Sequence, residues 1–437
     1  MTERIREIVG PSDLRQLHRE HPSRYPFLLQ STARGGALGR YDILFAFPGE
    51  ALVASEGTSF LDELDACWQN ERIDSSPNEL PFVGGWFLYL GYELAAEIEP
   101  GLNLVPDRIL PAAFAVRCPT ALVFDHEESL CHLVCETPGC VDKKQLLADI
   151  GALQRDQPVA TVAVVSVSEE EPRRFTDAVV RAKEYIAAGD IYQANLSREW
   201  SADVAASVDA NDVYEALSSS NPGPFAGMAR WQDLEIISSS PERLLQVRGD
   251  VASTRPIAGT RPRSDDVATD DSLSAELFAH PKERAEHIML VDLERNDLGR
   301  VCEAGTVEVN EMMVLESYAH VHHIVSNVRG RLRDDVTPGD AIAAVFPGGT
   351  ITGCPKVRCM EIISELEHGA RGAYTGSFGY LNRDGSLDLN ILIRTIVKQG
   401  ERVTFRAGSG IVADSDPEAE LEETRAKAEG MLRAITR

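Results

Sequence analysis

The C-terminal part of the chain contains successive strand-like segments in which apolar and polar residues alternate. They are TVEVNEMMVL, HVHHIVSNVRGRL, AYTGSFGYLN, SLDLNILIRTIVK and RVTFRAGSGIV, all between residues 306 and 412. A period of two is typical of β-strands with one buried face. These segments do not alternate regularly with helices, as the strands of a parallel sheet would. The sequence therefore predicts an α+β protein with antiparallel sheets and helices outside them.

The N-terminal part also contains strand and hairpin candidates, at residues 41–48, 82–93 and 120–136. The segment DQPVATVAVVSVSEEEP, residues 156–172, ends in acidic residues and proline and is the best candidate for a boundary. We expect an N-terminal region, 1–168, and a second region, 169–437, interlocked in one structure. A helix should follow the boundary, with Thr176 or Asp177 near its N-cap.

Net charge and hydropathy exclude several classes of function. The 437 residues carry 43 Lys and Arg against 69 Asp and Glu, a net charge of −26 that repels nucleic acid and anionic membranes. No long apolar run or hydrophobic signal core is present, so we expect a soluble cytoplasmic protein. The eight cysteines lack the paired spacing of a zinc site. Because the chain is strongly negative overall, a binding site for an anionic substrate would need positively charged residues of its own.

The stretch PKERAEHIMLVDLERNDLGR, residues 281–300, places acidic residues and a histidine in an apolar, helix-forming run. Glu283, Glu286 and His287 lie three and four residues apart, and Glu286 shares a helical face with Leu290. Burial of an ionised carboxylate is costly without a compensating cation. Two alternatives remain open for Glu286: an ion pair with Arg or Lys, or coordination of a metal.

The final helix is predicted to begin after Asp416, a good N-cap residue followed by Pro417. Its apolar stripe should be flanked by Glu420, Glu423 and Lys427, and a solvated Glu423–Lys427 pair is the simplest interpretation. A second acidic cluster in the chain also favours Mg²⁺, which two carboxylates from different helices can hold beside an anionic substrate.

Two glycine-rich segments and one arginine complete the candidate site. PGGTITGCPK, residues 347–356, is not a nucleotide-binding loop because Cys354 and Pro355 occupy the positions of Lys and Ser or Thr. RAGSGIV, residues 406–412, can present backbone amides to a carboxylate. Arg394 lies in a strand pattern and suits bidentate recognition of a carboxylate.

Together these motifs resemble the chorismate-binding enzyme family. The similarity is dense from about residue 174 to 434, in SSSPER, PIAGTRPR, KERAEHIMLVDLERNDLGRV, FPGGTITGCPKVRCMEIISELE and AGSGIVADSDPEAELEET. The resemblance implies a large two-layer α/β sandwich of antiparallel sheets with helices packed outside. It also implies an enzyme that acts on chorismate.

The resemblance further implies the roles of individual residues. Mg²⁺ would be held by Glu286 and Glu423, with Glu283 and Glu420 close by. The carboxylates of chorismate would be held by Tyr374, Thr350, Arg394, Gly408, Gly410 and Lys427. His323 and Glu242 would act near the departing C4 hydroxyl, and Thr350 also counts among the catalytic positions with Gln193 and Ala258.

Gln193 favours ammonia over water as the nucleophile. Isochorismate and salicylate synthases, which resemble this chain, carry a lysine at this position as the base that activates water, and glutamine cannot take a proton. Several motifs, IYQANLS, NPGPF and GGTITG, resemble aminodeoxychorismate synthases. Ala258 in PIAGT instead resembles anthranilate synthases, because many aminodeoxychorismate synthases have lysine there. Without that lysine, we expect a non-covalent 2-amino-2-deoxyisochorismate intermediate.

The family resemblance implies a separate glutamine amidotransferase subunit in a heterodimer, because no cysteine sits in a nucleophile elbow. Its product would be 4-amino-4-deoxychorismate, for para-aminobenzoate and folate synthesis. The alternative is anthranilate, and a non-catalytic chorismate-binding module is a third hypothesis, which the intact candidate residues disfavour. A tryptophan-like pocket is also expected around Leu29, Ser31 and Tyr41.

Overall fold

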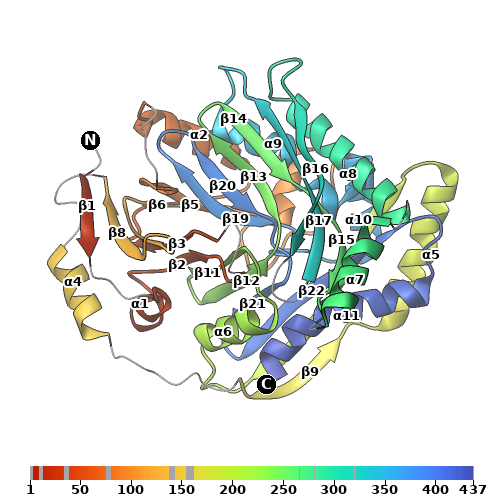
Figure 1. The fold of residues 1–437 in the computed structure, drawn as a ribbon, viewed down its shortest axis with the longest axis horizontal. Helices are drawn as coiled ribbons and strands as arrows, with labels where there is room; N and C mark the ends of the chain where they lie inside the picture. The colour runs from red at the N-terminus through yellow and green to blue at the C-terminus, as the bar shows by residue number, and fades with distance from the viewer. Residues whose placement is uncertain are drawn as a thin grey trace.

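Two large antiparallel β-sheets form the centre of the protein, with helices on their outer faces (Figure 1). The computed structural model describes residues 3–8, 13–33, 39–74, 80–136, 143–153, 162–264, 266–279, 281–317 and 321–436. Every strand pair in both sheets is antiparallel, as the sequence predicts. The protein therefore has an α+β fold.

The first sheet has 12 strands. In spatial order they are β1 (Glu3–Ile8), β8 (Leu130–Cys135), β7 (Thr120–Asp125), β3 (Tyr41–Ala46), β2 (Phe27–Gln30), β11 (Phe225–Trp231), β12 (Leu234–Ser240), β21 (Thr395–Gln399), β22 (Arg402–Ile411), β10 (Gln193–Val204) and β18 (Gly353–Cys354). β9 (Val164–Glu169) also pairs with β10. Strands from both sides of residue 168 thus share one sheet.

The second sheet has 10 strands and the same mixed origin. Its order is β15 (Ile257–Pro262), β17 (Val321–Arg331), β14 (Val251–Arg255), β13 (Arg243–Arg248), β20 (Leu387–Asn390), β19 (Ser377–Asn382), β5 (Gly85–Leu90), β6 (Ala113–Cys118) and β4 (Ala51–Val53). β16 (Glu308–Ser317) pairs with β17.

The helices connect these strands. They are α1 (Arg15–Glu20), α2 (Phe60–Glu71), α3 (Ala95–Ile98), α4 (Lys143–Ala152), α5 (Pro172–Ala188), α6 (Ala210–Ser220), α7 (Val267–Ala279), α8 (Pro281–Gly299), α9 (Pro338–Val345), α10 (Lys356–Glu367) and α11 (Pro417–Thr436), with short 3₁₀ turns η1 (Tyr92–Leu94) and η2 (Gly349–Ile351). None of the described helices is long and apolar enough to cross a membrane.

Aromatic residues from both sheets make the core between them. Phe27 of β2 stacks on Phe87 of β5 with ring centroids 4.0 Å apart, and Phe45 of β3 contacts Phe87 edge-on at 5.5 Å. All three side chains are buried. Burial of large apolar surfaces in this layer stabilises the face-to-face packing of the sheets. The result is the sandwich that the sequence resemblance implies.

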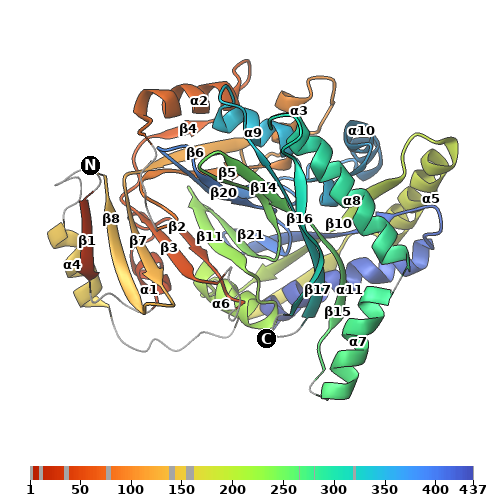
Figure 2. The same ribbon diagram turned by 45° about the horizontal axis from the view of Figure 1, so that its top comes forward.

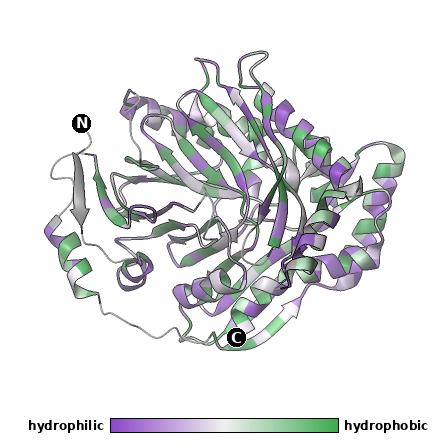
Figure 3. Cartoon of the chain, viewed as in Figure 1, coloured by the Kyte–Doolittle hydropathy of each residue, from purple (hydrophilic) through white to green (hydrophobic). Residues whose placement is uncertain are grey.

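Helices α5, α8, α10 and α11 gather at one end of the sandwich, on the right in both views, whereas α4 and β1 lie at the opposite end (Figures 1 and 2). The outer helices alternate hydrophilic and hydrophobic residues, as expected for helices with one buried face (Figure 3). The helices that carry the predicted acidic residues, α8 and α11, therefore both lie at this end.

Two helix boundaries show what local sequence can predict. The prediction for α5 is wrong at its start: the helix begins at Pro172, not near Thr176, because proline is favoured at a first helical position. For α11 the predicted N-cap is confirmed, since Asp416 Oδ1 accepts hydrogen bonds from the amides of Glu418 and Ala419 at 3.1 and 3.0 Å. This cap fixes the start of the helix that carries Glu420, Glu423 and Lys427.

Replacing Asp416 by alanine should lower the free energy of unfolding by about 1 kcal/mol, because two amides at the start of α11 lose their acceptor. Urea unfolding of the variant measures the change. Asp414→Ala, which removes an exposed carboxylate just before the cap, is the matched control. Equal stability of the two variants would contradict the capping role.

Candidate active site

Gln193 and Glu286 form the first contact of the candidate site. Gln193, the first residue of β10, is buried, and its Nε2 donates a hydrogen bond of 2.9 Å to Glu286 Oε1. Helix α8 presents Glu286 here because His287 and Leu290 bury the helix, and His287 Nε2 lies 2.5 Å from Ser326 Oγ of β17. Among the described side chains, Glu286 forms no ion pair with Lys or Arg, so its partner is a neutral amide.

The glycines of β22 let polar groups approach the backbone closely. A Cβ on Gly410 would lie 2.5 Å from Gln193 Nε2 and 3.6 Å from Glu286 Oε1. A Cβ on Gly408 would lie 2.7 Å from the hydroxyl of Tyr374. No other residue fits at these positions without displacing its neighbours. Predicted metal-binding and substrate-binding residues therefore meet along one strand.

Helix α11 reaches the same strand through Lys427. Its Nζ donates to Gly408 O at 3.0 Å and lies 2.8 Å from Glu423 Oε1, so the predicted Glu423–Lys427 pair is present. Glu420 differs from the prediction, since it is buried rather than flanking the apolar stripe. Glu420 Oε1 accepts a hydrogen bond of 2.6 Å from Ser415, whereas the buried Oε2 has no hydrogen-bond partner among the described groups.

These carboxylates suit a hard divalent cation. Mg²⁺ prefers carboxylate oxygens and retains several waters, and the buried Oε2 of Glu420 is an acceptor that a metal or its water would satisfy. Within the described residues, however, three potential ligand atoms within 4.8 Å of one another occur only at Asp125, Glu128 and His132. That group lies on the β7–β8 hairpin, where Arg40 already occupies Asp125 at 2.7 Å.

Glu242 belongs to a second group of candidate residues, which also contains His323 and Arg394. It follows β12, is buried, and accepts a hydrogen bond of 3.3 Å from the Ile257 amide through Oε1. Burial raises the pKa of its carboxyl to about 8, while the hydrogen bond from the Ile257 amide and the charge of Arg394 partly offset that effect. Glu242 is therefore largely protonated at neutral pH, which is the state required of a general acid.

His323 of β17 belongs to the same group. Burial and the nearby positive charge of Arg394 lower the pKa of its imidazole to about 3. His323 is consequently neutral throughout the physiological range. A neutral imidazole and a protonated carboxyl, each near Arg394, give the site one proton acceptor and one proton donor.

The prediction that Arg394 lies within a strand is wrong. Arg394 lies between β20 and β21 with φ of 52°, which breaks the predicted strand at residues 391–394. Its guanidinium donates to Asn221 Oδ1 at 3.0 Å. Burial lowers its pKa to about 10, and Glu242 opposes that effect, so Arg394 remains charged at neutral pH. The turn places a half-buried positive charge near Glu242.

The loop before α10 connects the two groups. Thr350 in η2 has a buried hydroxyl with no hydrogen-bond partner among the described groups, and Cys354 in β18 pairs with Gln193 of β10. The amide of Asn195 also donates to Thr352 O at 2.8 Å. The glycine-rich segment therefore packs against β10, the strand that carries Gln193.

Beside Tyr374 lies a buried cluster of ion pairs that the sequence analysis did not identify. Arg371 lies 2.6 Å from Glu367 and faces the Tyr374 ring, with its guanidinium carbon 5.5 Å from the centroid. Arg406 also reaches Glu367 at 3.2 Å. Burial raises the pKa of Tyr374 to about 12, so its hydroxyl is a neutral donor. A sequence signal existed, because Glu367 and Arg371 are spaced four residues apart.

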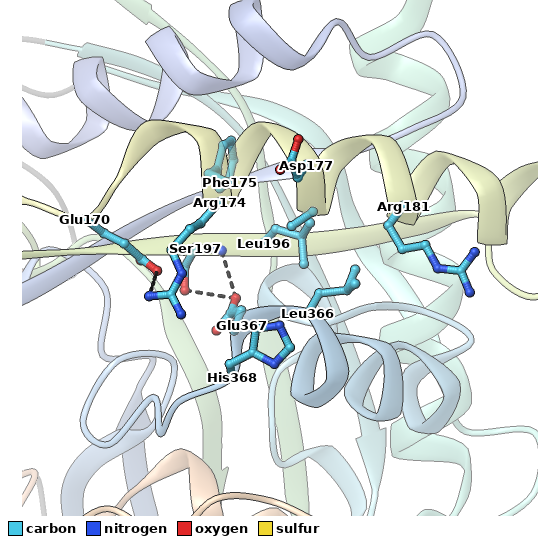
Figure 4. Close-up of a pocket in the computed structure, with 11 residues that line it drawn as sticks. Glu170, Arg174, Phe175, Asp177, Arg181, Leu196, Ser197, Leu366, Glu367 and His368 are labelled. Atoms are coloured by element: carbon cyan, nitrogen blue, oxygen red, sulfur yellow. Dashed lines mark hydrogen bonds and ion pairs between the residues drawn. The ribbon is translucent and has the colours of Figure 1, made fainter.

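Glu367 also forms the floor of a surface pocket of about 300 Å³ between α5, β10 and α10 (Figure 4). Its carboxylate accepts hydrogen bonds from the amide and hydroxyl of Ser197 at 2.8 and 3.0 Å. Arg174 and Arg181 at the rim are paired with Glu170 and Glu184. None of the predicted site residues lines this pocket, so it is a separate feature.

A larger cavity of about 410 Å³ lies between the two sheets, around Leu29, Ser31 and Tyr41. Arg243 and Asp388, which form a bidentate pair at 2.8 and 2.9 Å, also line it. The structure thus contains a cavity where the tryptophan-like pocket is predicted. Its ligand stays a prediction.

Two predicted site residues fall outside the described side chains. The backbone of Ala258 pairs with Ile324 in β15 and β17, but its side chain is not among those described. Glu283 lies in the first turn of α8, and its side chain is likewise outside the described set. Their predicted roles remain predictions.

Comparison with known proteins identifies the family and agrees with the fold. The family described as chorismate binding enzyme matches residues 25–433. An anthranilate synthase component I-like protein of Synechocystis is 43% identical over 406 residues, covering 91% of this chain and 83% of the relative. Aminodeoxychorismate synthase component 1 of Bacillus subtilis is 39% identical over 452 residues, covering 97% and 94%.

A solved structure extends the comparison. Anthranilate synthase component I of Streptococcus pneumoniae superposes with a TM-score of 0.80 at 32% identity, over 91% of this chain and 93% of that one. The fold and the site define an enzyme built on this sandwich. The chain belongs to the chorismate-binding enzyme family, and it acts on chorismate.

Arg394→Lys should lower kcat/KM for chorismate about 30-fold or more, because lysine keeps the charge but loses the planar fork and the contact with Asn221. Steady-state kinetics at saturating ammonia measures the loss. Arg402→Lys, at an exposed position on β22, is the control and should match the wild type. An unchanged kcat/KM in Arg394→Lys would place this residue in a purely structural contact.

Proposed function

We propose that this enzyme aminates chorismate with ammonia to form 4-amino-4-deoxychorismate. The observation that carries the proposal is the hydrogen bond from Gln193 to Glu286. A side-chain amide cannot remove a proton from water at neutral pH, so the position lacks a base that would generate hydroxide. Ammonia has its own lone pair and needs no such base.

Substrate binding would depend on the positive groups around β22 and β21. Arg394 is half-buried and charged, and Lys427 reaches Gly408 O. These cations supply the local positive charge that a chain of net charge −26 needs for a dianionic substrate. The close approach that Gly408 and Gly410 permit brings a carboxylate to the backbone amides of the strand.

We propose that Mg²⁺ is held by Glu286 and Glu423, with Glu283 and Glu420 completing the surrounding shell. The buried, unsatisfied Oε2 of Glu420 and the absence of a cation beside Glu286 among the described side chains support this assignment. When bound, Mg²⁺ would supply charge compensation for a carboxylate of the substrate. Lys427 would then retain its contact with Gly408 while Glu423 turns to the metal.

Proton transfer would involve Glu242 and His323. Protonated Glu242 donates its proton to the C4 hydroxyl, which leaves as water, while ammonia adds at C2 and the ring double bonds shift. Neutral His323 orients the leaving group. The proton that the added nitrogen loses replaces the one that Glu242 gives up, so the group is restored after the step.

The second step would convert this intermediate into product. A second ammonia adds at C4 of 2-amino-2-deoxyisochorismate, the C2 amine leaves as ammonia, and the double bonds return. The net reaction is chorismate plus ammonia to aminodeoxychorismate plus water. Ala258 carries no nucleophile, so the intermediate is expected to be non-covalent.

A second candidate function is formation of anthranilate and pyruvate. The specific observation in its favour is Ala258, together with relatives that are named anthranilate synthase component 1. Elimination of pyruvate from the same intermediate would give this product. Ammonia for either reaction would come from a glutamine amidotransferase subunit, with which this chain would form a heterodimer.

Glu286→Gln and Glu423→Gln should each lower turnover to background with both glutamine-derived and free ammonia, because each removes a proposed ligand charge. Initial rates across a Mg²⁺ titration measure the effect. Glu422→Gln, the neighbouring exposed carboxylate on α11, is the matched control. Wild-type rates and Mg²⁺ dependence in Glu423→Gln would refute the assignment.

Mass spectrometry of the products from chorismate, Mg²⁺ and ammonium should show aminodeoxychorismate, and intact-protein spectra under turnover should show no covalent adduct. Synthetic 2-amino-2-deoxyisochorismate with ammonia should give the same product. Failure to process this compound, or an adduct on any lysine, would contradict the route. Anthranilate as the main product would support the second candidate.

A further inference from the structure

Tyr374 lies in the loop that leads into β19 of the second sheet, but its hydroxyl lies over β22 of the first sheet. A Cβ on Gly408 of β22 would lie 2.7 Å from this hydroxyl. None of the described groups forms a hydrogen bond with the hydroxyl, so it can donate to a substrate carboxylate. The loop must therefore turn the tyrosine away from the sheet that the chain enters next.

The chain makes this turn at Thr375, whose φ is 65°. Left-handed backbone is rare for a β-branched residue, because its Cβ substituents crowd the neighbouring backbone. Glycine would adopt the same conformation without strain. A threonine stays in it only where the surrounding structure holds it there. Thr375 is 1% exposed, so that surrounding structure is the protein interior.

Hydrogen bonds to the backbone fix both ends of the turn. At its end, the amide of Thr375 donates to Leu392 O at 2.8 Å. At its start, Oε1 of Glu93 in η1 accepts hydrogen bonds from the amides of Arg371 and Gly372 at 2.8 and 3.2 Å. Glu93 comes from the N-terminal region of the chain, so both regions contribute to holding the turn.

The side chain of Thr375 adds a third restraint. Its hydroxyl donates to Tyr374 O at 2.5 Å and accepts a hydrogen bond of 3.3 Å from Nη1 of Arg371. The guanidinium of Arg371 is itself fixed, because Nε and Nη2 donate to the two carboxylate oxygens of Glu367 at 3.0 and 2.6 Å. The hydroxyl therefore ties the peptide that follows Tyr374 to the buried cluster of ion pairs.

The same guanidinium contacts β10, which carries Gln193. Nη2 of Arg371 donates to Asn195 O at 2.6 Å, two residues after Gln193. Strand β10 in turn pairs with β22, which carries Gly408. A planar guanidinium holds its donors in fixed directions, so these contacts set the turn in a defined position relative to both strands. The orientation of Tyr374 is therefore coupled to the strands that form the candidate site.

We propose that Thr375 is a positioning residue for chorismate: its hydroxyl keeps the left-handed turn that aims the Tyr374 hydroxyl at Gly408. Thr375 does not touch the substrate and acts only through Tyr374. The proposal rests on the proposed binding of a chorismate carboxylate beside Gly408, but not on which amine product is formed. A contact to a carboxylate exists in the ground state and in the transition state, so its loss should raise KM for chorismate rather than lower kcat.

The test is Thr375→Val, which keeps the shape and the β-branch but removes the hydroxyl. Without the contact to Arg371 the strained turn relaxes, and KM for chorismate should rise about tenfold with little change in kcat. Thr375→Ser keeps the hydroxyl and should keep the wild-type KM. Thr404→Val makes the same chemical change at a half-buried position of β22 and is the matched control. Rates of chorismate consumption at saturating ammonium measure both constants.

A double-mutant cycle separates positioning from a general structural role. Tyr374→Phe removes the hydroxyl whose position is in question, and should by itself raise KM for chorismate. Adding Thr375→Val to Tyr374→Phe should then have no further effect on KM, because Thr375 acts only through the missing hydroxyl. A residue that merely supports the fold would instead raise KM by the same factor in both backgrounds.

Thr375→Gly guards against a folding defect in Thr375→Val. Glycine adopts a φ of 65° without strain, so this variant removes the hydroxyl and lets the chain keep its path. Urea unfolding shows whether each variant is folded under the assay conditions. KM for chorismate should rise in Thr375→Gly as well, and this rise should also disappear in the Tyr374→Phe background.

The outcomes distinguish this proposal from the proposed function. A rise in KM that disappears without the Tyr374 hydroxyl supports the role of Thr375. A wild-type KM in the folded variants, a loss confined to kcat, or a rise that persists in full in Tyr374→Phe overturns that role and leaves the proposed function standing. If the wild-type protein does not consume chorismate with ammonium, or if Tyr374→Phe keeps the wild-type KM, the proposed site fails and the role of Thr375 fails with it.

Discussion

The hydrogen bond between Gln193 and Glu286 joins the first strand residue of β10 to the acidic face of α8. It depends on Gly410, which has no side chain to separate the two groups. No described cation pairs with Glu286, since its partner Gln193 is neutral, and a glutamine at this position offers no base to activate water. One contact therefore favours both a metal and an amine nucleophile.

Burial in the interior of the sandwich sets the protonation states of Glu242 and His323. Burial keeps Glu242 largely protonated and His323 neutral at neutral pH, whereas Arg394 stays charged although burial lowers its pKa. In water a glutamate carboxyl titrates well below neutral pH, and an imidazole titrates close to neutral pH. The sheets and α8 exclude solvent from this group, so the fold itself divides the roles of proton donor, proton acceptor and anion-binding cation.

Sequence periodicity predicted the antiparallel strands and α8 well, because each depends on neighbouring residues. It failed at Arg394, where the alternating pattern continues through a turn with positive φ that only tertiary contacts maintain. It also missed the ion cluster in which Arg406 of β22 and Arg371 both reach Glu367 of α10. The contact between Arg406 and Glu367 joins positions far apart in the chain, and no local pattern records such a contact.

The choice of nucleophile is the central claim, and isotope incorporation tests it directly. The enzyme is incubated with chorismate, Mg²⁺ and ammonium labelled with a heavy nitrogen isotope, in water labelled with a heavy oxygen isotope. The products are identified by mass spectrometry. The account predicts that the product carries the labelled nitrogen and no oxygen from the solvent. Isochorismate containing solvent oxygen as the main product would show that water is activated without a lysine at position 193, and would contradict the account.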